Sequence, residues 1–205
     1  MEHDPTFRAV LLVGFAVLAP VALFYRVRSQ LTGEKLDRRQ EGWFIYLTLR
    51  PIGVAGMVGV IVYLIDPRRM AWAAFPLPLW LRWTGAGLGV ITGGLIVWTF
   101  HNLGKNLTDT VVTRREHTLV TAGPYRWVRH PFYAAAALAV VANSLATANA
   151  FVLVTGVIAV ALIVIRTRRE EQHLVARFGD EYRSYMARTG RFVPRLTARS
   201  GGAAR

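Results

Sequence analysis

Apolar residues fall into five runs along this chain, and polar or charged segments separate the runs. The longer runs approach the roughly 20 apolar residues that a helix needs to cross a bilayer. We therefore predict an all-α integral membrane protein with about five transmembrane helices. The predicted helices are residues 7–25, 43–65, 79–100, 132–145 and 150–166.

The last two apolar runs are joined by the short segment 146–150, which predicts a helix-turn-helix hairpin. A hairpin brings its outer ends together, so polar residues before its first arm should meet those after its second arm. These residues are Tyr125, His130 and Tyr133 on one side and Arg166, Glu170 and Glu171 on the other. We expect this meeting point to be the functional site.

The chain beyond residue 166 is polar but keeps helical character. We predict that the fifth helix continues through Arg177, that Phe178 and Gly179 break it, and that residues 180–188 form a short amphipathic helix. This gives a three-helix membrane scaffold at 1–100, a catalytic region with a C-terminal helical cap at 101–195, and a disordered basic tail at 196–205.

Glycines are frequent in the third apolar run, and Gly89 and Gly93 have the spacing that lets membrane helices pack closely. We expect the third helix to contact a neighbour along this face. Leaving room for a ligand is the alternative role for these glycines.

The chain carries 25 Lys and Arg residues against 12 Asp and Glu, a formal net charge of +13. On a soluble domain this excess would suggest nucleic acid, but 53% of the residues are hydrophobic and the basic ones lie around the apolar runs. The segments after the first, third and fifth runs hold five, five and ten basic residues, and the opposite side holds four. We therefore predict an outside N-terminus and a cytosolic C-terminal cap, with membrane lipids rather than nucleic acid as partners. We expect the membrane to be a bacterial inner membrane.

The expected meeting point contains groups suited to binding a ligand. His130 offers one donor and one acceptor, and Tyr133 offers an aromatic face and a hydroxyl. Glu170 and Glu171 are helical neighbours pointing about 100° apart, so they cannot both serve one group. One could bind hydroxyls or an ammonium, and the other could pair with a loop arginine. An interfacial aromatic belt beside a solvated, weakly paired helix is the alternative.

Other catalytic signatures are missing from the sequence. The chain has no cysteine, which excludes disulfides and a thiol nucleophile. It has no His and carboxylate spacing typical of a metal site, so we predict no metal. It also has no phosphate-binding Walker motif and no Gly-x-Ser-x-Gly elbow.

Three groups of residues, in this order, resemble a known family. The first is Asn102-Leu103-Gly104-Lys105-Asn106. The second is His117-x-Leu119-Val120-Thr121-x-Gly123-Pro124-Tyr125, followed by Arg129-His130-Pro131-x-Tyr133. The third is Arg166-x-x-x-Glu170-Glu171-x-x-Leu174, followed by Phe178-Gly179-x-x-Tyr182-x-x-Tyr185 and Pro194. Together they resemble the isoprenylcysteine carboxyl methyltransferase and phospholipid methyltransferase superfamily, over about half of the chain.

The resemblance implies S-adenosylmethionine as methyl donor and a lipophilic acceptor that reaches the site sideways from the bilayer. The residues expected to bind the cofactor are His117, Leu119, Val120, Gly123, Tyr125, Arg129, His130, Pro131, Tyr133, Glu170 and Glu171. We expect Arg166 and Glu170 to be catalytic, and Arg166 and Arg50 to bind the acceptor. An arginine inside a membrane helix is a functional candidate, although Arg50 could instead extend to the interface.

The two arginines favour an ionised carboxylate as acceptor, because a guanidinium binds a carboxylate through two parallel hydrogen bonds. An acceptor that is already ionised needs no base. Phospholipid N-methylation, or methylation of another small lipophile, is the alternative, and an amine acceptor would require a base such as a glutamate or histidine. An NADPH enzyme similar to sterol reductases and a non-catalytic membrane protein are the remaining alternatives. The oligomeric state stays open.

Overall fold

The structure is a computed structural model that describes residues 5–30, 43–104 and 119–195. Its helices confirm the predicted all-α class, and β-type pairing in the described residues is limited to two isolated bridges. The elements are α1 Pro5–Gln30, α2 Trp43–Ile65, η2 Pro67–Ala73, α3 Leu79–Leu103, η4 Gly123–Arg126, α4 Pro131–Thr147 and α5 Ala150–Arg188. The predicted tail and His117 lie outside the described residues.

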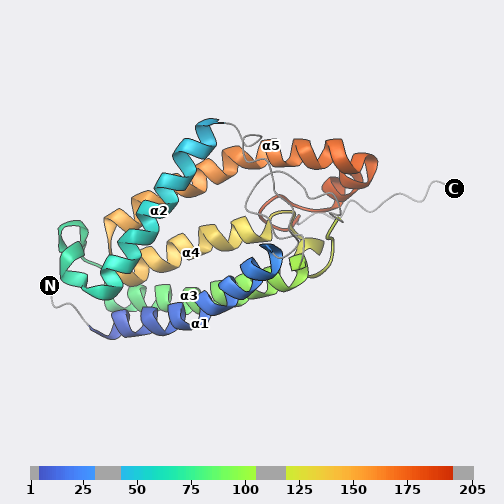
Figure 1. The fold of residues 1–205 in the computed structure, drawn as a ribbon. Helices are drawn as coiled ribbons and strands as arrows, with labels where there is room; N and C mark the ends of the chain where they lie inside the picture. The colour runs from blue at the N-terminus through green and yellow to red at the C-terminus, as the bar shows by residue number, and fades with distance from the viewer. Residues whose placement is uncertain (1–4, 31–42, 105–118, 196–205) are drawn as a thin grey trace.

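Helices α1, α3, α4 and α5 run roughly along one long axis, and α2 crosses them at a steeper angle (Figure 1). Helix α4 packs between α3 and α5, α1 lies against α3, and α2 lies against α5. We call the end that holds η2 and the turn between α4 and α5 the turn end. We call the end that holds η4, the start of α4 and the last third of α5 the site end.

Four helices are long and apolar enough to cross a membrane: Pro5–Tyr25, Leu47–Ile65, Leu79–Leu103 and Ala150–Arg188, and α4 is a shorter apolar helix. Their outward surfaces are apolar, as the exposed side chains of Val13, Val54 and Val90 illustrate. This is the surface expected of a membrane protein, because lipid tails replace water around it. The chain is therefore an integral membrane protein.

Helix α5 extends well beyond the bilayer. The residues from Ala150 to Phe178, before the non-helical backbone at Gly179, correspond to a length of about 44 Å, which exceeds the ~30 Å of a hydrocarbon core. Only its apolar first part, up to about Arg166, fits inside the membrane. The polar residues that follow, including Glu170 and Glu171, lie beyond the spanning segment.

Glycines set the closest helix contacts, although not where the sequence suggested. A Cβ on Gly85 would lie 2.6 Å from the backbone nitrogen of Ala146, so α3 and α4 cross there at backbone distance. Gly93 packs on Leu18 of α1, but nothing lies within 4 Å of a Cβ on Gly89. The predicted packing role is thus correct for Gly93 and wrong for Gly89, because no neighbouring atom of the described residues lies against Gly89.

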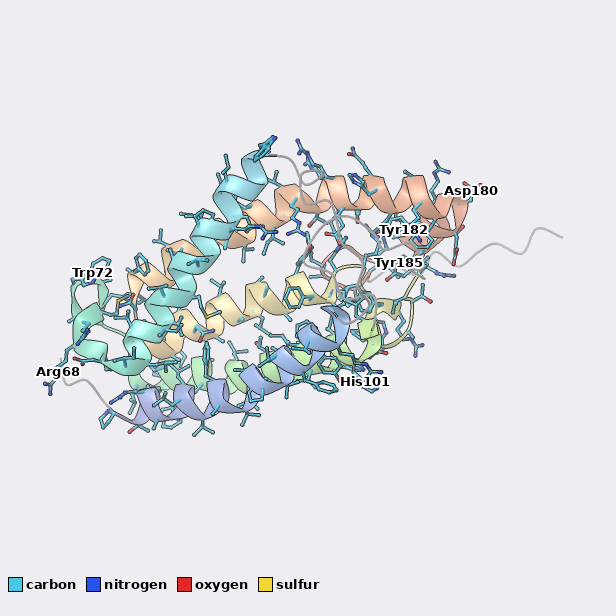
Figure 2. All side chains as sticks on the ribbon, in the orientation of Figure 1. Arg68, Trp72, His101, Asp180, Tyr182 and Tyr185 are labelled. Atoms are coloured by element: carbon cyan, nitrogen blue, oxygen red, sulfur yellow. The ribbon has the colours of Figure 1, made fainter. Side chains whose placement is uncertain are left out.

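The predicted break in the fifth helix is confirmed at Gly179, whose φ of 56° and ψ of −126° interrupt the helical backbone. A residue with a side chain adopts this positive φ only at a cost. After the break, the last turns of α5 place Tyr182 and Tyr185 at the site end (Figure 2). Both tyrosines are buried, and the Tyr185 hydroxyl donates to the backbone oxygen of Tyr125 at 2.6 Å.

Candidate active site

The turn that leads into α4 is shaped by two residues with special backbones. Gly123 has a φ of 59°, and a Cβ there would lie 2.3 Å from the Asn102 side chain, so only glycine fits against the end of α3. Pro131 opens α4, where its missing N–H costs nothing. His130, just before it, makes no helix-capping hydrogen bond with its side chain. Its ring is thereby available to face α5.

Glu171 is the buried centre of the site, with a side chain that is 5% exposed. Arg129 Nε donates to its Oε1 at 2.9 Å, and Arg191 Nη2 donates to its Oε2. His130 Nε2 lies 3.4 Å from the same Oε1, without the alignment of a hydrogen bond. Both carboxylate oxygens are therefore engaged by guanidinium groups of this chain.

The charge of Glu171 is fixed by these neighbours. Burial alone would raise the pKa of Glu171, but His130, Arg191 and Arg129 together outweigh it and hold the pKa at about 2. A carboxylate with two cationic partners favours its ionised form. Glu171 thus stays negative throughout the physiological pH range.

Glu170 has a more open environment than its neighbour. Tyr133 Oη donates to its Oε2 at 2.8 Å, and His130 Nδ1 lies 3.9 Å from its Oε1. The Glu170 side chain is 22% exposed, and within the described residues Tyr133 is its hydrogen-bond donor. One oxygen of Glu170 therefore keeps capacity for a further partner.

Aromatic rings lie beside this open carboxylate. The rings of His130 and Tyr133 are stacked, 5.4 Å apart and within 5° of parallel. Tyr125 is buried in η4, where burial and then the nearby charge of Glu170 raise the pKa of its phenol, so it stays protonated. The site thus combines an anion, two stacked rings and a buried phenol.

The hairpin brings together five of the predicted residues in direct contact: Arg129, His130, Tyr133, Glu170 and Glu171. Arg166 is buried one helical turn before Glu170, on the same face of α5. Arg50 is half-buried in the site-end half of α2. Leu119 and Val120 are half-buried in the approach to η4. Pro131 is buried.

Arg191 is a site residue that the sequence analysis missed. It lies 20 positions after Glu171, beyond the end of α5, and reaches back to that carboxylate. The neighbouring Pro194 was part of the motif, but no local pattern indicates that this arginine turns inward. Only the fold-back of the chain after Gly179 brings it to the site.

The fold and the site define a helical membrane protein with a charged, aromatic-lined cluster at one end of a helical hairpin. A family model described as the isoprenylcysteine carboxyl methyltransferase family matches residues 86–176. A nickel-cobalt-cadmium resistance protein of Alcaligenes xylosoxydans is 32% identical over 116 residues, 56% of this chain and 54% of that protein. The protein-S-isoprenylcysteine O-methyltransferase of Mus musculus is 29% identical over 126 residues, 60% of this chain and 44% of that protein.

The fold agrees with these sequence matches. A solved structure of the eukaryotic intramembrane Ras methyltransferase, isoprenylcysteine carboxyl methyltransferase, has a TM-score of 0.54 at 17% identity, covering 94% of this chain and 69% of that one. This likeness concerns the fold alone. The sequence matches support the isoprenylcysteine carboxyl methyltransferase superfamily, which the order of the motifs predicted. It spans about half the length of the curated relatives that it matches.

Proposed function

We propose that this chain is an S-adenosylmethionine-dependent membrane methyltransferase that acts on a lipophilic acceptor. The observation that carries the proposal is the group formed by Glu170, Tyr133 and His130. It presents an ionisable carboxylate beside two stacked rings, at the point where an apolar hairpin leaves the membrane. The match of residues 86–176 to the methyltransferase family model supports the same reaction class.

The residues at the site fit the proposed cofactor. S-adenosylmethionine carries an ammonium, ribose hydroxyls and a sulfonium cation, and it supplies an electrophilic methyl group when bound. Glu170 offers an oxygen that can accept from the ammonium or the hydroxyls. The neighbouring ring of Tyr133, which is half-buried, is of a kind that attracts a cation.

The acceptor is expected to meet the site at the membrane surface. The apolar part of α5 ends at Arg166, one turn before Glu170, so a lipid chain can stay in the bilayer while its polar head reaches the cluster. The guanidinium of Arg166 is the proposed partner of that head, and Arg50 is a second candidate. We propose a carboxylate as the head group, because it is already ionised and needs only to be aligned.

Ligand binding to the detergent-purified protein tests the cofactor. We expect S-adenosylhomocysteine to raise the melting temperature and to give a saturable calorimetric titration, and NADPH to do neither. Stabilisation by NADPH alone would replace the proposal with a reductase. No binding of either compound would indicate a non-catalytic protein.

Transfer of a labelled methyl group tests the acceptor. Matched lipophiles carrying a free carboxylate, a blocked carboxylate or an amine are supplied in detergent with the labelled cofactor. We expect transfer to the free carboxylate, with Arg166→Lys lowering turnover while S-adenosylhomocysteine affinity changes little, since only the two-pronged contact is lost. Transfer to the amine alone would assign N-methylation instead.

A further inference from the structure

The chain that follows α5 folds back and pairs with the segment that carries His130. We call residues 189–192 the strap and residues 127–130 the loop segment. The backbone N–H groups of Arg129 and His130 donate to the oxygens of Gly190 and Arg191, at 2.8 and 3.0 Å. The N–H of Gly190 donates back to the oxygen of Trp127 at 3.1 Å. The strap therefore forms a short parallel pairing with the loop segment.

The strap also touches the ring of His130. The ring of Phe192 lies 5.9 Å from the His130 ring, centroid to centroid. A Cβ on Gly190 would lie 1.7 Å from the Val193 oxygen, so the strap turns too tightly for any side chain at that position. His130 is thus held between the strap on one side and Tyr133 on the other.

Two arginines fasten this arrangement to α5 through Glu171. Arg191 of the strap and Arg129 of the loop segment each donate to one oxygen of that carboxylate. Arg129 Nη1 also donates to the backbone oxygens of Met186, at 3.1 Å, and Thr189. Glu171 and Arg129 are buried, whereas the Arg191 side chain is 36% exposed. Removing Arg191 leaves one oxygen of a buried carboxylate without its cationic partner, which is unfavourable. We call the contact between Arg191, Glu171 and Arg129 the clasp.

The clasp leaves the two adjacent glutamates in different states. Glu171 is 5% exposed, and both of its oxygens accept from guanidinium groups. Glu170 is 22% exposed and accepts from the neutral hydroxyl of Tyr133. A ligand cation can therefore reach Glu170 without displacing an ion pair, whereas at Glu171 it would have to compete with two arginines.

We propose that Arg191 is a positioning residue, which clasps the strap onto the loop segment through Glu171 and so fixes His130, while Glu170 is the carboxylate that meets the ligand. The part concerning the ligand rests on the proposed function. The part concerning the clasp does not, because it describes contacts within the chain itself.

Hydrogen exchange of the ligand-free protein tests the clasp. In Arg191→Gln we expect peptides that contain the amides of Arg129, His130 and Gly190 to exchange about tenfold faster than in the unmodified protein, because the pairing opens more often. Arg183→Gln is the matched control, since Arg183 lies in the same part of α5 but pairs at the surface with Asp180. Equal exchange in Arg191→Gln and the unmodified protein would overturn the clasp.

S-adenosylhomocysteine affinity tests the positioning role. We expect Arg191→Gln to weaken binding about fivefold or more, Arg191→Lys to recover part of that loss, and Arg183→Gln to bind normally. Faster exchange with unchanged affinity would show that the clasp does not position the site, and would overturn this role. If the unmodified protein binds no S-adenosylhomocysteine, the proposed function fails, and the exchange comparison still decides the clasp. Arg191→Lys replaces the glutamine variant in both measurements if the latter does not fold.

Discussion

Asn149 at the turn end and Glu170 at the site end are both polar side chains beside α5, yet their contacts differ. Asn149 is 1% exposed, its Oδ1 accepts from the N–H groups of Phe151 and Val152, and its Nδ2 donates to the oxygen of Met70 at 2.9 Å. The hydrogen-bonding groups of its side chain are thus used within the chain. Glu170 keeps an oxygen with spare capacity and is partly exposed.

At the turn end, the charged side chain of Arg82 is likewise used in contacts within the chain. Its guanidinium donates to the oxygen of Ala146 through Nε at 3.2 Å and through Nη2 at 3.1 Å, and it lies 3.9 Å above the ring of Phe7. Nη2 also reaches the hydroxyl of Tyr63 at 3.3 Å. This one side chain joins α3 to three other helices. A polar group that ties helices together stabilises the bundle, whereas one with spare capacity can bind a ligand.

The largest effect is expected from a test of where the two ends lie. The excess of basic residues at the site end predicts that this end is cytosolic and the turn end is outside. Because the chain has no native cysteine, single cysteines report cleanly. In intact cells, Arg69→Cys should react with an impermeant maleimide and Arg183→Cys should not. Both side chains are exposed, so a difference in labelling reports on which side of the membrane each one lies. The opposite pattern would place the site away from cytosolic cofactors. Arg68 and Asp180, their neighbours, mark the two ends in Figure 2.

The next largest effect is expected at the turn end. Asn149→Ala removes the N-cap of α5 and leaves the oxygen of Met70 buried without its donor, which together should cost about 2–4 kcal/mol of unfolding free energy. Asn143→Ala is the control, because the Asn143 side chain donates only to Ala139 one turn earlier in its own helix. Denaturation in detergent measures both variants. Equal losses would show that Asn149 has no special structural role.

Glu170→Gln should change binding while leaving the fold intact. Replacing the carboxylate by an amide keeps the shape and an acceptor for Tyr133 but removes the charge, so we expect S-adenosylhomocysteine to bind about 1–3 kcal/mol more weakly. Glu181→Gln, at an exposed position of the same helix, should bind normally. Glu171→Gln should instead lower stability and affinity together, because it breaks the clasp. Normal binding by Glu170→Gln would remove Glu170 from the cofactor site.

Chain connectivity explains why much of the site end could be predicted. Two apolar runs joined by a short turn leave little choice but a hairpin, and the hairpin places His130 and Tyr133 beside Glu170 and Glu171. Adjacent helical positions point in different directions, which correctly indicated that one glutamate would pair with a loop arginine. Sequence alone could not say which of the two glutamates pairs with the arginine, because the rotation of α5 about its axis is set by packing against α4.

Contacts made by distant segments could not be predicted. Arg191 reaches Glu171 only because the backbone at Gly179 turns the chain back, and Asn149 reaches Met70 across a separation of 79 residues. Gly89 likewise has the spacing of a packing glycine, but no atom of the described residues lies within 4 Å of a Cβ built there. In each case the local sequence pattern is compatible with several directions of the side chain, and the packing of whole helices selects one.

The smallest effect on stability is expected from Arg183→Gln. This variant tests whether an ion pair stabilises the site end even when it is exposed. Arg183 Nη1 lies 2.7 Å from Asp180 Oδ1, a shorter contact than Arg129 makes with Glu171. However, the side chains of Arg183 and Asp180 are 61% and 94% exposed, so water and salt screen their attraction and little is lost when it is removed. We expect the melting temperature to change by about one degree or less. Arg129→Gln, by contrast, uncovers a buried carboxylate and should unfold the site end at a clearly lower temperature. A comparable loss in both variants would mean that the number of charges, rather than their burial, holds this end together.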